Sequence, residues 1–192
     1  MSQYPNAAEG VKKIYISQLI FIAALILAAI PLLGTIGRIL KIVACVIYLM
    51  GLKKAGEDGD GYNKAFTYEI VNIVFVLVIV IVSLIPLIGG ILGTVLGIIT
   101  SIIDLLVLNT VITTTGGLLR NVGATDIAEN GQSVWTMYII CTVISIICSL
   151  LSVIPLINIL AGIVAFIVTI VLLVALIRYI IFLNKAATAL GA

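Results

Sequence analysis

The sequence contains no histidine, and charged residues occupy only 9% of its 192 positions. Histidine is the commonest metal ligand and a frequent general base, so its absence removes much acid–base and metal chemistry. Soluble domains are about 25% charged and about 45–50% apolar, whereas this chain is 63% hydrophobic. A water-soluble protein of this size cannot bury so much apolar surface, and we therefore expect a membrane protein.

Cysteine is also scarce, and the signatures of known chemistries are missing. Cys45, Cys141 and Cys148 all lie in apolar runs, and none of them forms the CxxC pair of zinc or redox sites. The sequence has no GxSxG, HExxH or Walker loop. The net charge of +2 is too small to indicate a nucleic-acid partner. We expect no catalytic residue, no cofactor and no metal, and thus no enzyme.

Long apolar runs are what the sequence has in abundance. Three stretches without any charge are 24, 34 and 48 residues long and cover residues 14–37, 70–103 and 130–177. A spanning helix needs roughly 20 residues. The runs do not alternate as barrel strands do, and lipid requires every backbone group to be paired internally. The sequence predicts an all-α integral membrane protein with six transmembrane helices, at 11–30, 32–52, 66–85, 87–110, 135–154 and 156–183.

One short pattern marks three break points in these runs. An Ile-Pro-Leu segment followed by an apolar residue and Gly or Asn surrounds Pro31, Pro86 and Pro155. A proline excludes the residue before it from the α region, and Gly or Asn tolerates a turn. We interpret the three prolines as hinges of tandem helical hairpins in a single membrane domain, 1–192, with internal repeats at about 9–57, 62–123 and 131–188. Chance similarity among Ile/Leu-rich strings is the alternative.

The basic residues gather at one end of the predicted hairpins. By the positive-inside rule this end is cytoplasmic, which predicts a multi-pass protein of the cell (inner or cytoplasmic) membrane with both termini cytoplasmic. Aromatic residues near the same end predict an interfacial belt. Two polar segments, 55–64 and 116–133, are expected to be loops, and the first of them is expected to be a solvated acidic turn. The basic residues are Lys12, Lys13, Lys53, Lys54, Lys64, Arg120, Arg178 and Lys185, and the belt comprises Trp135, Tyr15, Tyr62, Tyr68, Tyr138 and Tyr179.

Three charged residues, Arg38, Lys41 and Asp104, interrupt the predicted spans. An ionisable group inside a span is costly and is treated as a functional candidate. One interpretation is a polar path through the membrane. The other is intramembrane pairing, in which Asp104 pairs with Lys13 or Arg178 while the two cations snorkel outward or line a subunit interface.

Small residues recur at four-residue spacing, above all Gly89, Gly93 and Gly97. Such ridges let helices approach closely, although the sequence does not separate packing within a chain from packing between chains. We therefore expect a structural or assembly protein in the lipid bilayer, which forms tightly packed homo-oligomers or joins other membrane subunits. The alternative is a small transporter or channel that uses the three intramembrane charges.

Two-helix repeats with a proline near the end of each first helix invite comparison with mitochondrial carriers. That family carries an acidic residue two positions after the proline, where this chain has Leu33, Ile88 and Ile157. The signature of the family is therefore missing. In its general pattern the chain resembles the many short, uncharacterised multi-pass membrane proteins of prokaryotes, and this resemblance implies no activity.

Overall fold

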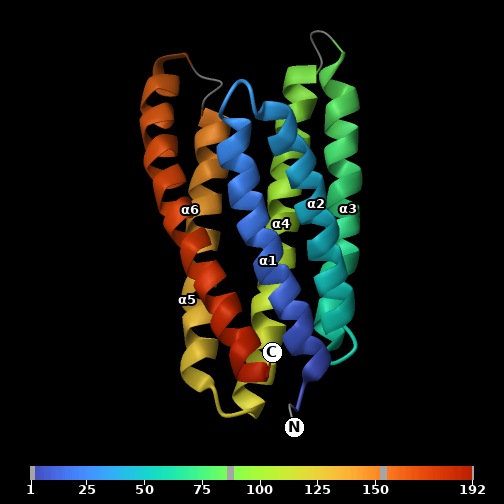
Figure 1. The fold of residues 1–192 in the computed structure, drawn as a ribbon. Helices are drawn as coiled ribbons and strands as arrows, with labels where there is room; N and C mark the ends of the chain where they lie inside the picture. The colour runs from blue at the N-terminus through green and yellow to red at the C-terminus, as the bar shows by residue number, and fades with distance from the viewer. Residues whose placement is uncertain (1–2, 86–88, 152–154, 192) are drawn as a thin grey trace.

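A computed structural model of the protein describes residues 3–85, 89–151 and 155–191, without the side chains of 89–91 and 155–157. It consists of six helices, each long and apolar enough to cross a membrane. They lie side by side, and the start of the first helix and the end of the last lie at the same end of the bundle (Figure 1). The prediction of an all-α fold with six membrane helices is confirmed. The helices are α1 (Pro5–Ala28), α2 (Gly34–Ala55), α3 (Asp60–Ser83), α4 (Gly89–Asn121), α5 (Thr125–Leu151) and α6 (Pro155–Leu190).

The six helices form a ring in the order of the sequence. Each helix packs on the next one along the chain, and α6 returns to pack on α1. Because neighbouring helices are joined by short links, they run antiparallel around the ring (Figure 1). Contact across the ring is limited, with α4 touching α6 only slightly. A ring of this kind has an interior that side chains must fill, and here they fill it at one end.

The hydrophobic core occupies the half of the ring that holds the termini. Its residues come from the beginnings of α1, α3 and α5 and from the ends of α2, α4 and α6. The largest fully buried side chains include Ile14, Tyr62, Leu119, Phe182 and Leu183. Since burying each large apolar side chain contributes about 1.5–3 kcal/mol, this half provides most of the packing that holds the six helices together.

The two polar segments predicted as loops are largely helical. The links between helices at this end are only residues 56–59 and 122–124. Tyr62 and Leu119 lie within the segments predicted as loops, and both are fully buried. Their burial explains the extra helical turns, because core packing continues beyond the apolar runs. Gly123 has a φ of 81°, a left-handed conformation that glycine adopts at no steric cost and that allows the short turn into α5.

The predicted aromatic belt is wrong for two tyrosines. Tyr62 and Tyr179 have exposed fractions of 0% and 3% and lie inside the ring instead of at the lipid boundary. The ring of Tyr179 meets Tyr138 edge to face, with centroids 6.4 Å apart, and stacks on Phe182 at 6.4 Å. Because aromatic side chains fill large interior volumes, they close the wide centre of a six-helix ring better than aliphatic residues do.

The prolines predicted as hinges lie at helix boundaries wherever they are described. Pro31 is exposed in the turn between α1 and α2, where the Leu33 N–H donates to the Ile30 carbonyl at 2.9 Å. Pro155 is the first residue of α6, a position that tolerates proline because its missing N–H would have no helical partner. Pro86 lies outside the described residues.

Glycines bring α1 and α2 into backbone contact. A Cβ at Gly10 would lie 2.5 Å from the backbone nitrogen of Ala55, and one at Gly37 would lie 2.5 Å from that of Ala28. No side chain fits at such distances, so these positions require glycine for the helices to pack. The four-residue spacing predicted this role for the glycines of α4 and did not reveal those of α1 and α2.

Candidate functional site

The interior of the ring contains a cavity of about 930 Å³ next to the hydrophobic core, and all six helices contribute to its wall. Small-molecule sites in proteins have volumes of about 300–1,000 Å³. Most of the wall is aliphatic or aromatic, but five side chains on α1, α2, α3 and α4 are charged or carry an amide: Gln18, Lys41, Glu69, Asn72 and Asp104. A cavity of this size and composition can hold a small organic molecule.

The polar groups on the α3 and α4 side of the cavity interact with one another. Asn72 has an exposed fraction of 7%, and its Nδ2 donates to Asp104 Oδ1 at 2.5 Å. Glu69 precedes Asn72 by three residues and therefore shares its face of α3. Glu69 and Asp104 line the same cavity, so that two carboxyl groups face one interior space. We refer to Glu69, Asn72 and Asp104 as the acidic wall.

Two buried polar atoms at the cavity have no hydrogen-bond partner among the residues that the structure describes. They are Asn72 Oδ1 and the hydroxyl of Tyr179, and both residues line the cavity. The Tyr48 hydroxyl lies near that of Tyr179, but the pair does not have hydrogen-bond geometry. Since most buried polar atoms in proteins are paired, this wall is suited to a further polar group.

The structure places Lys41 and Asp104 together at the cavity but separates Arg38 from them. Lys41 is half-buried and lines the cavity, as does Asp104. Arg38 lies one turn from Lys41 on α2, is exposed and does not line it. The two cations of α2 are therefore in different surroundings, although their spacing of three residues predicted one helical stripe.

The predicted pairing of Asp104 with Lys13 or Arg178 is wrong. Asn72 is the partner of Asp104. Lys13 forms an ion pair with Glu9 on its own helix, and the guanidinium of Arg178 contacts the sulfur of a methionine. The physical reason is that α3 packs beside α4 in the ring, which places an amide of α3 next to the carboxylate of Asp104.

Glu69 and Asn72 were missed as site residues. In the sequence, Glu69 is the charged residue immediately before the apolar stretch 70–103. In the structure α3 begins at Asp60, so Glu69 lies nine residues inside the helix. The signal that was available is Asn72, a lone amide in an otherwise apolar run, at a spacing that places it on the same helix face as Glu69.

A cleft of about 390 Å³ continues from the cavity between α4 and α5. Ser101 of α4 and Ser145 of α5 line both spaces. The cleft extends along Thr94 and Gly97 on α4 and Ser149 on α5, and thus toward the end of the ring opposite the termini. Small and hydroxyl side chains therefore border a route that leads from the acidic wall to this end.

The glycines of α4 that were predicted to pack helices are open within this chain. A Cβ at Gly93 or Gly97 would meet nothing within 4 Å. Gly89 is the first residue of α4. No described helix therefore packs closely on Gly93 or Gly97, and Gly97 borders the cleft between α4 and α5. Their role in helix packing stays a prediction.

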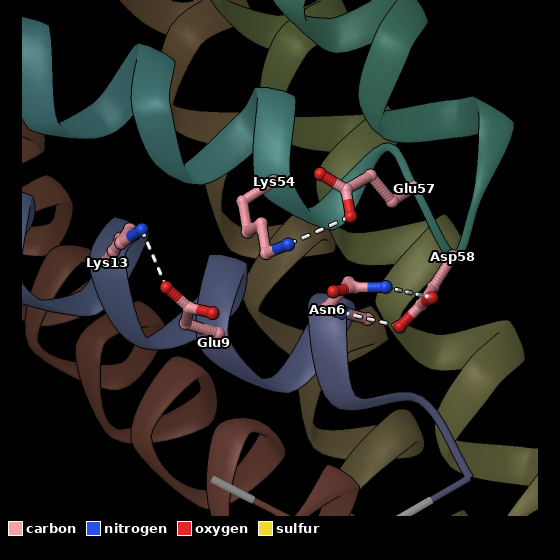
Figure 2. Close-up of polar contacts among 7 residues, drawn as sticks. Asn6, Glu9, Lys13, Lys54, Glu57 and Asp58 are labelled. Atoms are coloured by element: carbon pink, nitrogen blue, oxygen red, sulfur yellow. Dashed lines mark hydrogen bonds and ion pairs between the residues drawn. The ribbon is translucent and has the colours of Figure 1, made fainter.

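A second polar cluster, shown in Figure 2, ties the beginning of α1 to the link between α2 and α3. Asp58 Oδ2 accepts a hydrogen bond from the Ala7 N–H at 2.7 Å, and Asp58 Oδ1 accepts one from Asn6 Nδ2 at 3.0 Å. The carboxylate satisfies a free N–H at the positive end of the helix dipole. The solvated acidic turn predicted here is instead a cap for α1. Two ion pairs lie beside it, Glu9–Lys13 and Lys54–Glu57, each at 2.8 Å.

Replacing Asp58 with alanine is expected to lower the free energy of unfolding by about 1–2 kcal/mol, the usual cost of losing a helix cap. The measurement is a detergent-denaturation curve followed by circular dichroism. Asp58→Asn keeps an acceptor and is expected to lose less. Glu57→Gln removes a surface ion pair, worth about 0–1 kcal/mol, and serves as the neighbouring control. A loss at Asp58→Ala no larger than at Glu57→Gln would contradict the cap.

Neither a group of metal ligands nor a similar known protein indicates a particular chemistry for the site. Within the described part of the chain, no three His, Cys, Asp or Glu side chains are grouped so that they could hold a metal ion. No family model matches the sequence, and no curated protein and no solved structure shows significant similarity to it. The function must therefore be argued from the cavity and its lining.

Proposed function

We propose that the protein is a small membrane carrier or channel whose solute enters the cavity of the helix ring. The observation that carries this proposal is the cavity itself, with a wall formed by all six helices. The hydrophobic core adjoins it at the end that holds the termini, and the cleft between α4 and α5 leads toward the other end. A purely structural scaffold would gain nothing from charged side chains on an interior wall, where ionisable groups are costly.

The proposal includes the finer topology of the chain. We propose three tandem hairpins, α1–α2, α3–α4 and α5–α6, in the cytoplasmic membrane with both termini cytoplasmic. The basic residues at the ends of the helices near the termini support this orientation by the positive-inside rule. Packing within each of the three helix pairs supports the hairpin unit. In this orientation the core closes the cytoplasmic side, and the cleft opens outward.

Cys45 provides a test of the proposal, because it lines the cavity, whereas Cys141 and Cys148 are buried. In a Cys141→Ala/Cys148→Ala chain in proteoliposomes, we expect a membrane-impermeant cationic thiosulfonate, trimethylammonium-ethyl methanethiosulfonate, to modify Cys45 from one side of the membrane only. The thiolate is the reactive form and requires water. Mass spectrometry of the labelled protein measures the rate.

The control for this experiment is the neighbouring residue on α2. Val46 is exposed on the outside of the ring and does not line the cavity. In a Val46→Cys/Cys45→Ala version of the same chain, the thiol faces lipid. We expect its labelling rate to be lower by about tenfold or more, since lipid suppresses thiolate formation. Equal rates at the two positions, or no reaction at Cys45 from either side, would overturn the proposal of a wetted cavity.

Self-assembly is a second proposal, supported by an open glycine of α4. Gly93 leaves space for a closely packed helix, as small residues do at helix interfaces in membranes. Light scattering on the detergent-solubilised protein gives the mass of the particle. We expect an oligomer that Gly93→Leu dissociates and Gly162→Leu does not, since Gly162 is open in the same way but lies on α6. A clean monomer would contradict self-assembly.

A further inference from the structure

The two carboxylates of the acidic wall have no ion-pair partner among the described residues. Glu69 and Asp104 line the same cavity. The two ion pairs among the described residues are both near the termini end, and neither includes a cavity carboxylate. Lys41 lines the same cavity but forms no ion pair with either acid in the described part of the chain. Negative charge inside a membrane protein is costly unless a cation accompanies it, so the wall favours a positively charged ligand.

The unpaired atoms specify what kind of cation fits. Asn72 is more than nine-tenths buried, and its amide nitrogen donates a hydrogen bond to Asp104. Its Oδ1 is left as an acceptor without a donor in the described part of the chain. An amide oxygen beside two carboxylates presents acceptors only. An ammonium group has three N–H donors and no acceptor, which complements this set.

The size of the cavity and its apolar wall specify the remainder of the ligand. About 930 Å³ is far more than an inorganic ion occupies. Apart from its polar groups, the wall consists of side chains such as Phe21, Val76, Leu108, Leu172 and Leu176. Among the described residues, no three His, Cys, Asp or Glu side chains are grouped so that they could hold a metal ion, whereas a divalent cation prefers several carboxylate and other oxygen ligands. An apolar body that carries one positively charged group matches both parts of the wall.

We propose that Glu69, Asn72 and Asp104 bind the ammonium group of a small, largely apolar amine whose body lies against the aliphatic part of the cavity. The inference rests on the proposed function in one respect, that the cavity admits a solute from water. It goes beyond that proposal by naming the class of solute and the three residues that recognise its charged group. Tyr48, Tyr138 and Tyr179 add ring faces and edges to the same cavity, and aromatic faces attract cations.

Calorimetric titration of the purified protein in detergent with three matched probes tests the inference. Phenylbutylamine is cationic at neutral pH and has N–H donors, its trimethylammonium analogue keeps the charge without them, and phenylbutanol keeps the apolar body without charge. We expect the amine to bind about tenfold or more tightly than either analogue, because charge-assisted hydrogen bonds are its only advantage. Equal affinity for the amine and the alcohol would overturn the inference, and so would equal affinity for the amine and its trimethylated form.

Variants assign the effect to the acidic wall. Asp104→Asn keeps the volume and an acceptor for Asn72, and we expect it to weaken amine binding about tenfold or more while leaving phenylbutanol unchanged. Glu69→Gln provides the same test at the second carboxylate. Glu57→Gln removes a carboxylate at the surface and is expected to change nothing. Unchanged affinity for the amine in both cavity variants would refute the site.

The labelling of Cys45 separates failure of this inference from failure of the proposed function. If the amine slows modification of Cys45 by the thiosulfonate and the alcohol does not, the ligand occupies the cavity as inferred. If Cys45 reacts from one side but no amine slows it, the carrier proposal stands and the amine site is wrong. If Cys45 does not react at all, the wetted cavity and the amine site fail together.

Discussion

Replacement of Tyr62 by alanine is expected to lower the free energy of unfolding by about 3–5 kcal/mol, the usual cost of removing a large aromatic side chain from a packed core. Tyr62 has an exposed fraction of 0% and is the largest fully buried side chain of the described residues. It lies on α3 in the half of the ring that closes the cavity at the termini end. Its loss would leave a void among helices that are held in place by their packing.

The hydroxyl of Tyr62 contributes a smaller part of this effect. It lies 2.7 Å from Thr115 Oγ1, and the Thr115 hydroxyl in turn donates to the Val111 carbonyl at 2.7 Å. Because the single proton of Thr115 is used for Val111, Tyr62 is the donor of the first bond. Tyr62→Phe removes that bond and leaves Thr115 still paired, so we expect a loss of only about 0.5–1.5 kcal/mol.

Tyr68 is the matched control for this prediction. It is on the same helix as Tyr62, but 36% of it is exposed, so Tyr68→Ala is expected to cost less than 1 kcal/mol by the usual behaviour of surface positions (roughly ±0.5 kcal/mol). The three variants are compared by denaturation in mixed micelles, followed by circular dichroism. If Tyr62→Ala were as stable as Tyr68→Ala, the core at this end would not be the element that holds the ring together.

The sequence was sufficient to predict the helices because lipid leaves the backbone few alternatives. Uninterrupted apolar runs must be helical in a membrane, and the six runs correspond to α1 to α6. The helix ends were predicted less well, since Tyr62 and Leu119 lie in polar segments and only their burial extends the helices. The polar composition of 55–64 and 116–133 does not reveal these additional helical turns, because a few buried core residues are enough to stabilise a turn of helix.

The candidate site was predicted only in part, for a physical reason. A charged residue inside an apolar run is conspicuous in the sequence, so Lys41 and Asp104 were predicted as candidate site residues. The surroundings of these residues depend on how the helices pack, for example on α3 lying beside α4. Contacts between helices leave no periodic pattern in the sequence. Asn72 as the partner of Asp104 and Asp58 as the cap of α1 arise from that packing. Neither residue type is unusual enough alone to reveal such a role.

Lys41→Glu is expected to change the charge preference of the cavity by about 30-fold or more, and Cys45 reports this change. Cys45 follows Lys41 by one turn, about 6 Å along the helix, and both line the cavity. The ratio of labelling rates with cationic and anionic thiosulfonates measures the local potential. Both reagents attack the same thiolate, so any effect of the substitution on the amount of thiolate cancels in the ratio.

The magnitude follows from the number of charge interactions that change. The substitution alters the side chain by two unit charges, and the two reagents also differ by two, so the ratio changes by four pairwise interactions. At a separation of about 6 Å and an effective dielectric constant of about 20, each is worth up to about 2–3 kcal/mol. Even if water in the cavity reduces each to about 0.5 kcal/mol, the total of about 2 kcal/mol corresponds to about 30-fold.

Arg38→Glu makes the same change of charge one turn from Lys41 on α2 and is the matched control for this prediction. Arg38 precedes Cys45 by seven residues, about 10 Å along the helix, is exposed and does not line the cavity. Its charge therefore acts on Cys45 from farther away and through α2 instead of across a shared space. We expect a change of only a few-fold for this variant, in keeping with the small energies of exposed charges. Equal effects of the two substitutions would mean that Lys41 does not act on the cavity, and the two cations of α2 would then be equivalent surface groups.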